Sequence, residues 1–295
     1  MEQFKGAVAI GFLRLFACLP FALAQRLGAL VGWAMYQFPN REREVTRINL
    51  QHCMPELEPA ERERLVRETM IQSGRTFAES ACAWIWKPEK TLKRVKQVEG
   101  EHLLHEALDG DKGVVFITSH LGNWEVLNHW YSLHCAPVGF YRPPKLKAID
   151  DLLRRQRAQL GNRLAPSTRE GISMVMREVR QGGAVGIPVD PEPARKSGEF
   201  VPFFAIQALT SKFVPNLLKG GQARGVFLHC VRLEDHSGFK VIVEPAPEAM
   251  YSADAETAVA SMSSVLERYV RQWPSQYMWS MKRFKKRPQG EEEWY

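Results

Sequence analysis

Residues 113–126, GVVFITSHLGNWEV, constrain the fold of this chain more than any other stretch. The four apolar β-forming residues at 114–117 predict a buried strand. Polar residues end the strand, and the Gly122-Asn123 pair permits a tight turn before a helix predicted over 124–133. His120 is therefore expected at the carboxyl end of a central strand, where open α/β sheets place their ligands.

Glu125 follows His120 by five residues, on the first turn of the predicted helix. The turn can bring the carboxylate to the imidazole, and a carboxylate on one ring nitrogen makes the other nitrogen a better base. The spacing alone equally fits a structural histidine that is satisfied inside the fold. The order of strand, histidine, glycine turn and acid favours His120 and Glu125 as a catalytic pair.

The rest of the pattern predicts an α/β fold, with one domain built on a central mixed sheet flanked by helices. Further strands are expected at 94–99, 138–141, 184–189 and 200–204, with a hairpin from 225–233 and 239–244. Helices are expected at 58–86, 102–108, 146–160, 171–181, 210–220 and 255–272. Because His120, Arg142 and Asp190 occur at or just after strand ends, we expect the active site at one edge of the sheet.

Residues 7–38 are the most apolar region of the chain. Arg14 and Arg26 divide it into runs shorter than the ~20 residues that a spanning helix needs, and Pro20 predicts a kink. We interpret it as one or two helices at a membrane interface, with both arginines reaching the headgroups. A buried helix pair is the alternative. We therefore predict an anchoring segment at 1–40 and a catalytic domain at 41–295.

The net charge of +7 favours an anionic partner, such as nucleic acid, anionic lipid or an acidic protein. No nucleic-acid reader motif is present, so we expect no nucleic acid. The five scattered cysteines support neither a disulfide framework nor a zinc site. No metal or nucleotide motif occurs, and we expect neither metal nor cofactor. The basic run at 282–287 either meets an anionic partner or is a solvated tail.

Four further blocks accompany the His120–Glu125 motif. They are Asn49-Leu50 with Met54-Pro55-Glu56-Leu57 and Glu61-Arg62; Tyr141-Arg142-Pro143 with Ile149-Asp150 and Arg157; Asp190 with Phe200-Val201-Pro202-Phe203-Phe204 and Thr210; and Gln276-Tyr277-Met278-Trp279 with Arg283-Phe284-Lys285 and Arg287-Pro288. In this order they resemble the late lauroyl and myristoyl acyltransferases of lipid A biosynthesis, a branch of the His-x4-acid acyltransferases. Pro191, Glu192 and Met281 depart from the family pattern.

The resemblance implies transfer of a laurate- or myristate-class acyl chain from acyl carrier protein to a lipid A precursor, on a hydroxyl of one of its hydroxyacyl chains. It also implies a place at the cytoplasmic face of the bacterial inner membrane, in contact with membrane lipids. The carrier is acidic, which suits the basic charge. His120 is expected to act as general base with Glu125 orienting it, and Arg142, Arg157 and Asp190 are expected to bind substrate.

Transfer is expected to be direct, because no serine or cysteine lies in a nucleophile-elbow pattern. Arg157 could hold a phosphate or the oxyanion, or could belong to the solvated face of a basic helix. Two other functions remain open at this point. One is acylation of a lysophospholipid or glycerolipid, and the other is a non-catalytic membrane adaptor that binds acidic partners.

Overall fold

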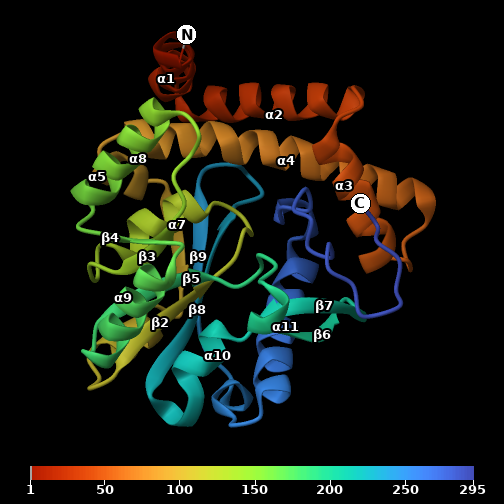
Figure 1. The fold of residues 1–295 in the computed structure, drawn as a ribbon. Coiled ribbons are helices and arrows are strands. Elements are labelled where there is room, and N and C mark those ends of the chain that lie inside the picture. The colour runs from red at the N-terminus through yellow and green to blue at the C-terminus, as the bar shows by residue number, and fades with distance from the viewer. Residues whose placement is uncertain (1) are drawn as a thin grey trace.

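A seven-stranded sheet forms the centre of the computed structural model, which describes the backbone of residues 2–295 and the side chains from Phe4 onward (Figure 1). Its strand order is β1-β9-β8-β2-β5-β3-β4. All neighbouring pairs are parallel except the antiparallel pair β8–β9, so the predicted mixed sheet is confirmed. The strands are β1 (Val95–Glu99), β2 (Gly113–Thr118), β3 (Val138–Tyr141), β4 (Arg163–Pro166), β5 (Ala184–Pro188), β8 (Ala223–Arg232) and β9 (Phe239–Pro245).

Strand β2 lies between β5 and β8 and is buried on both faces. Val115 and Ile117 enter the hydrophobic cluster on one face, while Val114 and Phe116 enter the cluster on the other. A strand covered on both faces requires apolar residues at every position, because successive side chains point to opposite sides. This explains why the run at 114–117 is continuous rather than alternating.

The helices divide between the two faces of the sheet. One face is covered by α9 (Arg169–Arg180), α10 (Phe213–Leu218) and α11 (Ala255–Gln272). The other is covered by α4 (Pro59–Ile85), α6 (Glu101–Leu108) and α7 (Trp124–Tyr131), with the amino-terminal helices packed on α4. The remaining helices are α3 (Arg41–Cys53), α5 (Pro88–Leu92) and α8 (Lys147–Gln159), with 3-10 turns at η1 (Arg195–Ser197), η2 (Lys219–Gly221), η3 (Glu248–Tyr251) and η4 (Pro274–Gln276).

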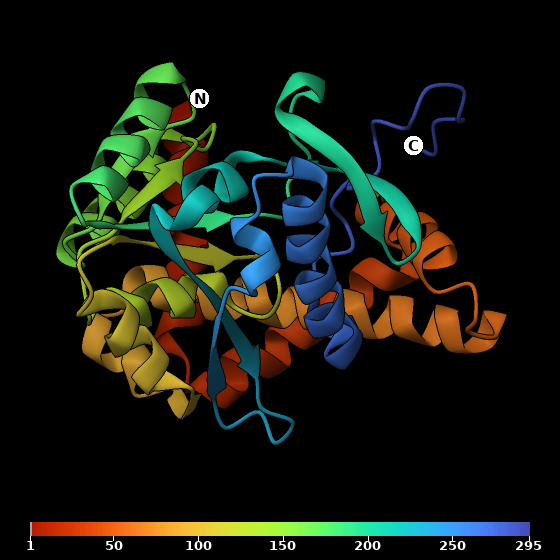
Figure 2. The ribbon, with the colours of Figure 1, turned by 90° about the horizontal axis from the view of Figure 1, so that it is seen from below.

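The helix predicted over 210–220 is wrong in its first part, because Thr210 belongs to a strand. Strand β7 (Ile206–Ser211) pairs with β6 (Gly198–Phe203) in a separate hairpin that extends away from the main sheet beside α11 (Figure 2). Its turn consists of Phe204 and Ala205, both at positive φ. Such turns usually contain Asn or Gly, so the sequence gives no signal for this one.

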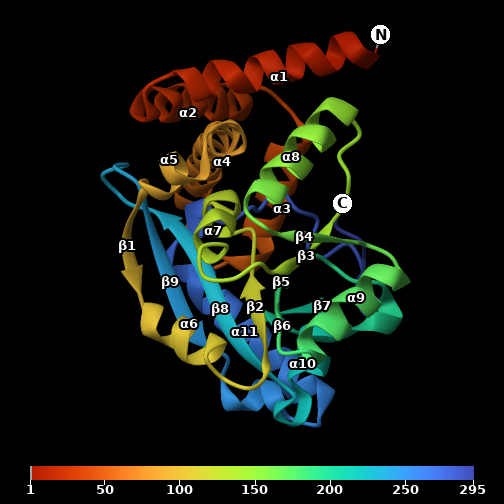
Figure 3. The ribbon, with the colours of Figure 1, turned by 90° about the vertical axis from the view of Figure 1, so that its left-hand side faces the viewer.

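The apolar amino-terminal region forms two helices, α1 (Glu2–Cys18) and α2 (Phe21–Gln37), which separate at Leu19 and Pro20. Figure 3 shows them as the outermost layer, with α4 between them and the sheet. Helices α2 and α4 approach closely where Gly28 and Gly32 face Gly74, since a Cβ at these positions would strike the opposite backbone. Within residues 2–295, no helix combines the length and apolar character that crossing a bilayer requires.

One side of each amino-terminal helix is buried and the other is exposed. The buried side chains facing the core are Leu13, Phe16, Ala17, Phe21 and Ala24. The large exposed apolar side chains are Phe4, Val8, Phe12, Leu15, Leu23, Leu27, Leu30, Val31, Trp33 and Met35, and Arg14 and Arg26 are also exposed. The exposed face contradicts the alternative of a fully buried helix pair, and the placement of these helices at a membrane interface stays a prediction.

Candidate active site

His120 lies just beyond the carboxyl end of β2, in a turn held on both sides by backbone hydrogen bonds. The amide of Gly122 donates to the carbonyl of Gln276 at 3.0 Å, and the amide of Asn123 donates to the carbonyl of Cys230 at 2.7 Å. Gly122 has a φ of 69°, and a Cβ there would strike the Cys230 carbonyl. Glycine is therefore required at this turn, which fixes where the imidazole stands.

Asp190, after β5, is the carboxylate that contacts His120. Its Oδ1 lies 3.1 Å from Nδ1 of His120, and its Oδ2 accepts a hydrogen bond from the backbone amide of His120 at 2.9 Å. A carboxylate only accepts hydrogen bonds, so Nδ1 carries the proton and Nε2 is left with a lone pair. Asp190 is fully buried, while the side chain of His120 keeps 23% of its surface exposed.

The charges of this pair shift both pKa values. Burial alone would lower the pKa of His120, but the charge and hydrogen bond of Asp190 outweigh it, with a smaller contribution from Glu125, and the pKa is raised. For Asp190, burial would raise the pKa, and the interactions with His120 outweigh burial and lower it. The structure thus holds a buried carboxylate against an imidazole that can accept a proton at its outer nitrogen.

Glu125 does not take the position predicted for it. Its Oε2 accepts a hydrogen bond from Arg157 of α8 at 2.6 Å, in an ion pair whose side chains are 8% and 14% exposed. The physical reason is the helix start: Asn123 caps α7 by accepting from the amides of Glu125 and Val126, and the Glu125 side chain meets α8. The expected contact between His120 and Glu125 is corrected to His120 with Asp190, and Arg157 pairs with Glu125.

Two cavities meet at His120. The first, here called the polar cavity, has a volume of about 360 Å³. Its lining combines the polar side chains of Glu125, Asn128, Arg142, Arg157, Asn162 and Arg163 with apolar ones such as Leu127, Phe140 and Leu153. The second has a volume of about 170 Å³ and lies between α4 and the carboxyl-terminal segment, lined by Ser73, Thr76, Phe77, Ser80, Trp84, Gly122, Gln276, Met278 and Ser280. His120 and Trp124 line both cavities. The imidazole of His120 can therefore contact a ligand in each cavity at the same time. The second cavity is here called the apolar cavity, because most of its wall surface is apolar.

The structure thus brings all five predicted residues to one site, four of them in two pairs. Arg142 is exposed and contributes to the wall of the polar cavity. Asp190, which we expected to bind substrate, lies fully buried against His120. Its carboxylate contacts the imidazole of His120 and lines neither cavity.

Glu79 of α4 supports the turn from behind, and the sequence analysis missed it. Its carboxylate forms an ion pair with Arg232 of β8, both side chains being at most 1% exposed, and it accepts from Gln25 of α2 at 2.7 Å. It also accepts from the Asn123 side chain at 3.2 Å. An acid within the apolar stretch at 77–86 is a signal that a buried partner must exist, but Arg232 is too distant in sequence to be identified.

Two further groups near the site are largely internal. His229 lies 3.4 Å from the Ser119 hydroxyl and is buried, which lowers its pKa to about 4, so it is neutral at physiological pH.

In the basic run at 282–287, Arg283 is buried and donates to the Leu209 carbonyl, while Lys286 pairs with Glu192. Arg283 and Lys286 are therefore tied into the fold, and the solvated-tail alternative is wrong for them, whereas Lys285 is exposed.

Residues 4–286 match the family of bacterial lipid A biosynthesis acyltransferases. The chain is 29% identical over 290 residues to the lipid A biosynthesis palmitoleoyltransferase of Escherichia coli (strain K12), covering 97% of this chain and 92% of that protein. It is 28% identical over 284 residues to the lauroyltransferase of the same strain, covering 96% and 92%. It is also 28% identical over 269 residues to the myristoyltransferase, covering 90% and 81%.

Proposed function

The chain belongs to the bacterial lipid A biosynthesis acyltransferase family and is an acyltransferase, and we propose that it moves a fatty acyl chain from a carrier-protein thioester to a hydroxyl of a hydroxyacyl chain on a lipid A precursor. The observation that carries this proposal is the His120–Asp190 pair at the meeting point of a polar and an apolar cavity. An acyl transfer between a charged glycolipid and a fatty thioester needs a base that both substrates can reach.

In the proposed reaction, Nε2 of His120 takes the proton from the acceptor hydroxyl as its oxygen attacks the thioester carbonyl. Asp190 keeps the proton on Nδ1 and stabilises the imidazolium that forms. Collapse of the tetrahedral intermediate breaks the carbon–sulfur bond, and the imidazolium returns the proton to the departing sulfur. The ester and the free thiol are the products, and His120 ends neutral.

We assign the polar cavity to the phosphorylated sugar side of the acceptor. The exposed Arg142 lies in its lining, and guanidinium is the side-chain group best suited to bind phosphate. Arg163 also lies in the lining, but it is paired with Glu178. Arg157 is already paired with Glu125, so it would meet the acceptor as part of a neutralised pair. The Glu125–Arg157 pair then shapes the wall beside His120 rather than supplying a free charge.

We assign the apolar cavity to an acyl chain. Phe77, in its wall, packs against Phe12 and Phe16 of α1, with ring centroids 6.2 and 6.1 Å apart. This wall is thus continuous with the exposed apolar surface of the amino-terminal helices. A chain could reach the site from a bilayer that contacts α1 and α2 without passing through water.

The proposal places the protein at the cytoplasmic face of the bacterial inner membrane, with α1 and α2 lying in the interface. The exposed apolar side chains of these helices support it, because a soluble surface rarely exposes so many together. Acyl carrier protein is proposed as the donor because it is acidic and this chain carries a net charge of +7.

The test uses the full chain in detergent micelles, with lauroyl and myristoyl carrier protein as donors. The acceptor is a phosphorylated disaccharide lipid A precursor, and mass spectrometry of the product should show one added acyl chain. The variant His120→Ala should lose the transfer while its circular dichroism and thermal unfolding remain as in the wild type. His102→Ala, an exposed histidine on α6, is the matched control.

Two results would refute the proposal. One is a wild-type protein that is folded but leaves the carrier thioester intact in the presence of the precursor. The other is a His120→Ala variant that transfers at the wild-type rate. A lysophospholipid offered as competing acceptor tests the acceptor class, because preferential acylation of it would contradict the lipid A assignment.

A further inference from the structure

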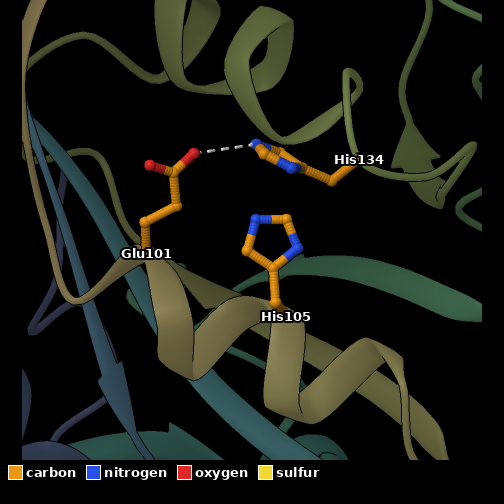
Figure 4. A group of neighbouring side chains, drawn as sticks. All are labelled: Glu101, His105 and His134. Carbon is orange, nitrogen blue, oxygen red and sulfur yellow. Dashed lines mark ion pairs between the residues drawn. The ribbon is translucent and has the colours of Figure 1, made fainter.

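Two histidines and a glutamate gather on the surface of the molecule, outside both cavities (Figure 4). Glu101 and His105 are four residues apart on α6, which places them on the same face of that helix. His134 follows α7 and points toward them. One ligand atom from each of the three lies within 4.8 Å of the others.

The His134 imidazole presents an unused nitrogen to this cluster. Its Nε2 is buried and has no hydrogen-bond partner within the part of the chain that the structure describes. It lies 3.8 Å from Oε1 of Glu101, which is too long for a hydrogen bond. Two ligands at about 2.05 Å from one tetrahedral zinc ion are separated by about 3.4 Å. The 3.8 Å between Nε2 of His134 and Oε1 of Glu101 is only slightly longer than this separation.

The surroundings restrict the ring of His134. The ring packs on Trp130, with centroids 4.8 Å apart, which restricts its orientation. Glu101 and His105 are exposed and can rotate to close the remaining distance.

We propose that Glu101, His105 and His134 form a binding site for a divalent transition-metal ion, with zinc as its ion and water as the fourth ligand. Two imidazoles and one carboxylate suit zinc and its neighbours in the first transition row, whereas magnesium and calcium require oxygen ligands. No sequence motif indicates the site, because His134 lies 29 residues beyond His105.

The position of the site indicates a structural role. Helix α6 precedes β2 and α7 follows it, so a shared ion would join the two segments on either side of the strand that leads to His120. The eight residues of α7 span about 12 Å, with the catalytic turn at one end of the helix and His134 beyond the other. The ion would therefore stabilise the support of the active site without touching substrate.

The experiment measures zinc binding to the full chain, purified in detergent without a polyhistidine tag and stripped with a chelator. Competition with a chromophoric chelator should show one zinc ion per chain, and cobalt should give the visible absorption of a tetrahedral site. His105→Ala should weaken binding at least about 10-fold, since loss of a direct ligand costs no less than loss of a residue that orients one. His134→Ala should do the same, and zinc should raise the thermal midpoint of the wild type but not of these two variants.

His102→Ala is the control for loss of an exposed histidine from the same helix, and it should bind zinc as the wild type does. Equal zinc affinity in wild type and His105→Ala would overturn the proposal, as would a wild type that binds no ion at 100-fold molar excess of zinc over chain. His105 is exposed, so its replacement tests the site even if His134→Ala does not fold. None of these measurements depends on acyl transfer.

Discussion

At the scale of single residues, the His120–Asp190 pair determines which nitrogen of the imidazole can act. The variant Asp190→Asn would remove the negative charge while keeping the size of the side chain. We expect kcat for acyl transfer to fall by about 10²–10⁴, the usual contribution of an oriented general base. Initial rates with saturating donor and acceptor measure the effect. Asp151→Asn, at a partly exposed carboxylate on α8, should leave kcat unchanged, and an equal loss in both variants would contradict a role in catalysis.

With His120 as the proposed base, the same pair should set the pH dependence of the reaction. Because Asp190 raises the pKa of His120, the active neutral imidazole predominates only above that raised value, and kcat/KM should fall as the pH decreases through it. The acid limb of wild type should therefore lie above the ordinary histidine pKa of about 6.5. In Asp190→Asn, burial opposes charging without this carboxylate, so the limb should move to lower pH. A limb that stays in place would assign the titration to another group, but not to His229, whose pKa is about 4.

The Glu125–Arg157 pair makes a different prediction, because each charge is buried and satisfied by the other. Arg157→Met alone leaves an unpaired carboxylate and should lower the free energy of unfolding by about 3–5 kcal/mol. The double variant Glu125→Gln, Arg157→Met should recover most of that loss. Thermal and urea unfolding measure it, with Lys147→Met at an exposed pair as the control that changes stability by less than about 1 kcal/mol.

The transfer activity of the double variant then shows whether the Glu125–Arg157 pair only supports the fold or also contacts the substrate. If the pair only supports the fold, the double variant should regain transfer along with stability. Recovered stability with low activity would show that the guanidinium or carboxylate contacts the acceptor. The single variant Glu125→Gln completes the comparison. If the loss of stability in the double variant equals the sum of the losses in Glu125→Gln and Arg157→Met, the pairing itself is contradicted.

At the scale of secondary structure, Glu79 connects three elements to the catalytic turn. It receives hydrogen bonds from α2, from β8 and from the Asn123 side chain that caps α7. Glu79→Gln would leave the Arg232 guanidinium buried without a counter-charge, and we expect a loss of about 3–5 kcal/mol in unfolding free energy together with lower kcat. Glu99→Gln, at an ion pair with a 64% exposed carboxylate, should cost less than about 1 kcal/mol. Similar losses in both variants would contradict a special role for Glu79.

Elements were predictable where local chemistry determined them. The β2 run, the β8–β9 hairpin and α11 follow from apolar periodicity and turn residues, and the sequence places them almost as the structure does. The β6–β7 turn at Phe204 and Ala205 was not predictable, because tertiary contacts stabilise it: the Phe204 amide donates to Glu267 of α11. The site shows the same division. His120 was found from its strand, but its partner was misassigned, because Asp190 lies 70 residues away and only the parallel pairing of β2 with β5 brings it close.

At the scale of the whole molecule, the exposed apolar side of α1 and α2 should determine where the enzyme works. We consider the quadruple variant Phe12→Ser, Leu15→Ser, Leu30→Ser, Val31→Ser, whose native side chains are all at least 42% exposed. If insertion buries about half of each side chain, the variant should lose about 3 kcal/mol of membrane affinity, close to a 100-fold fall in partitioning. Cosedimentation with vesicles of phosphatidylethanolamine and phosphatidylglycerol measures it. Unfolding should change little, because these side chains contribute little to the core.

The control must show that vesicle binding depends on the apolar side of α1 and α2, and not on exposed apolar residues in general. Leu133 and Ile172 are exposed apolar residues elsewhere on the molecule, and replacing both with Ser should leave vesicle binding unchanged. Equal partitioning of the quadruple variant and the wild type would contradict the interfacial placement of α1 and α2. Because Phe12 also packs against Phe77 of the apolar cavity, the quadruple variant should acylate precursor in vesicles more slowly than precursor in detergent micelles. That difference would indicate that the bilayer delivers a substrate to the site through this surface.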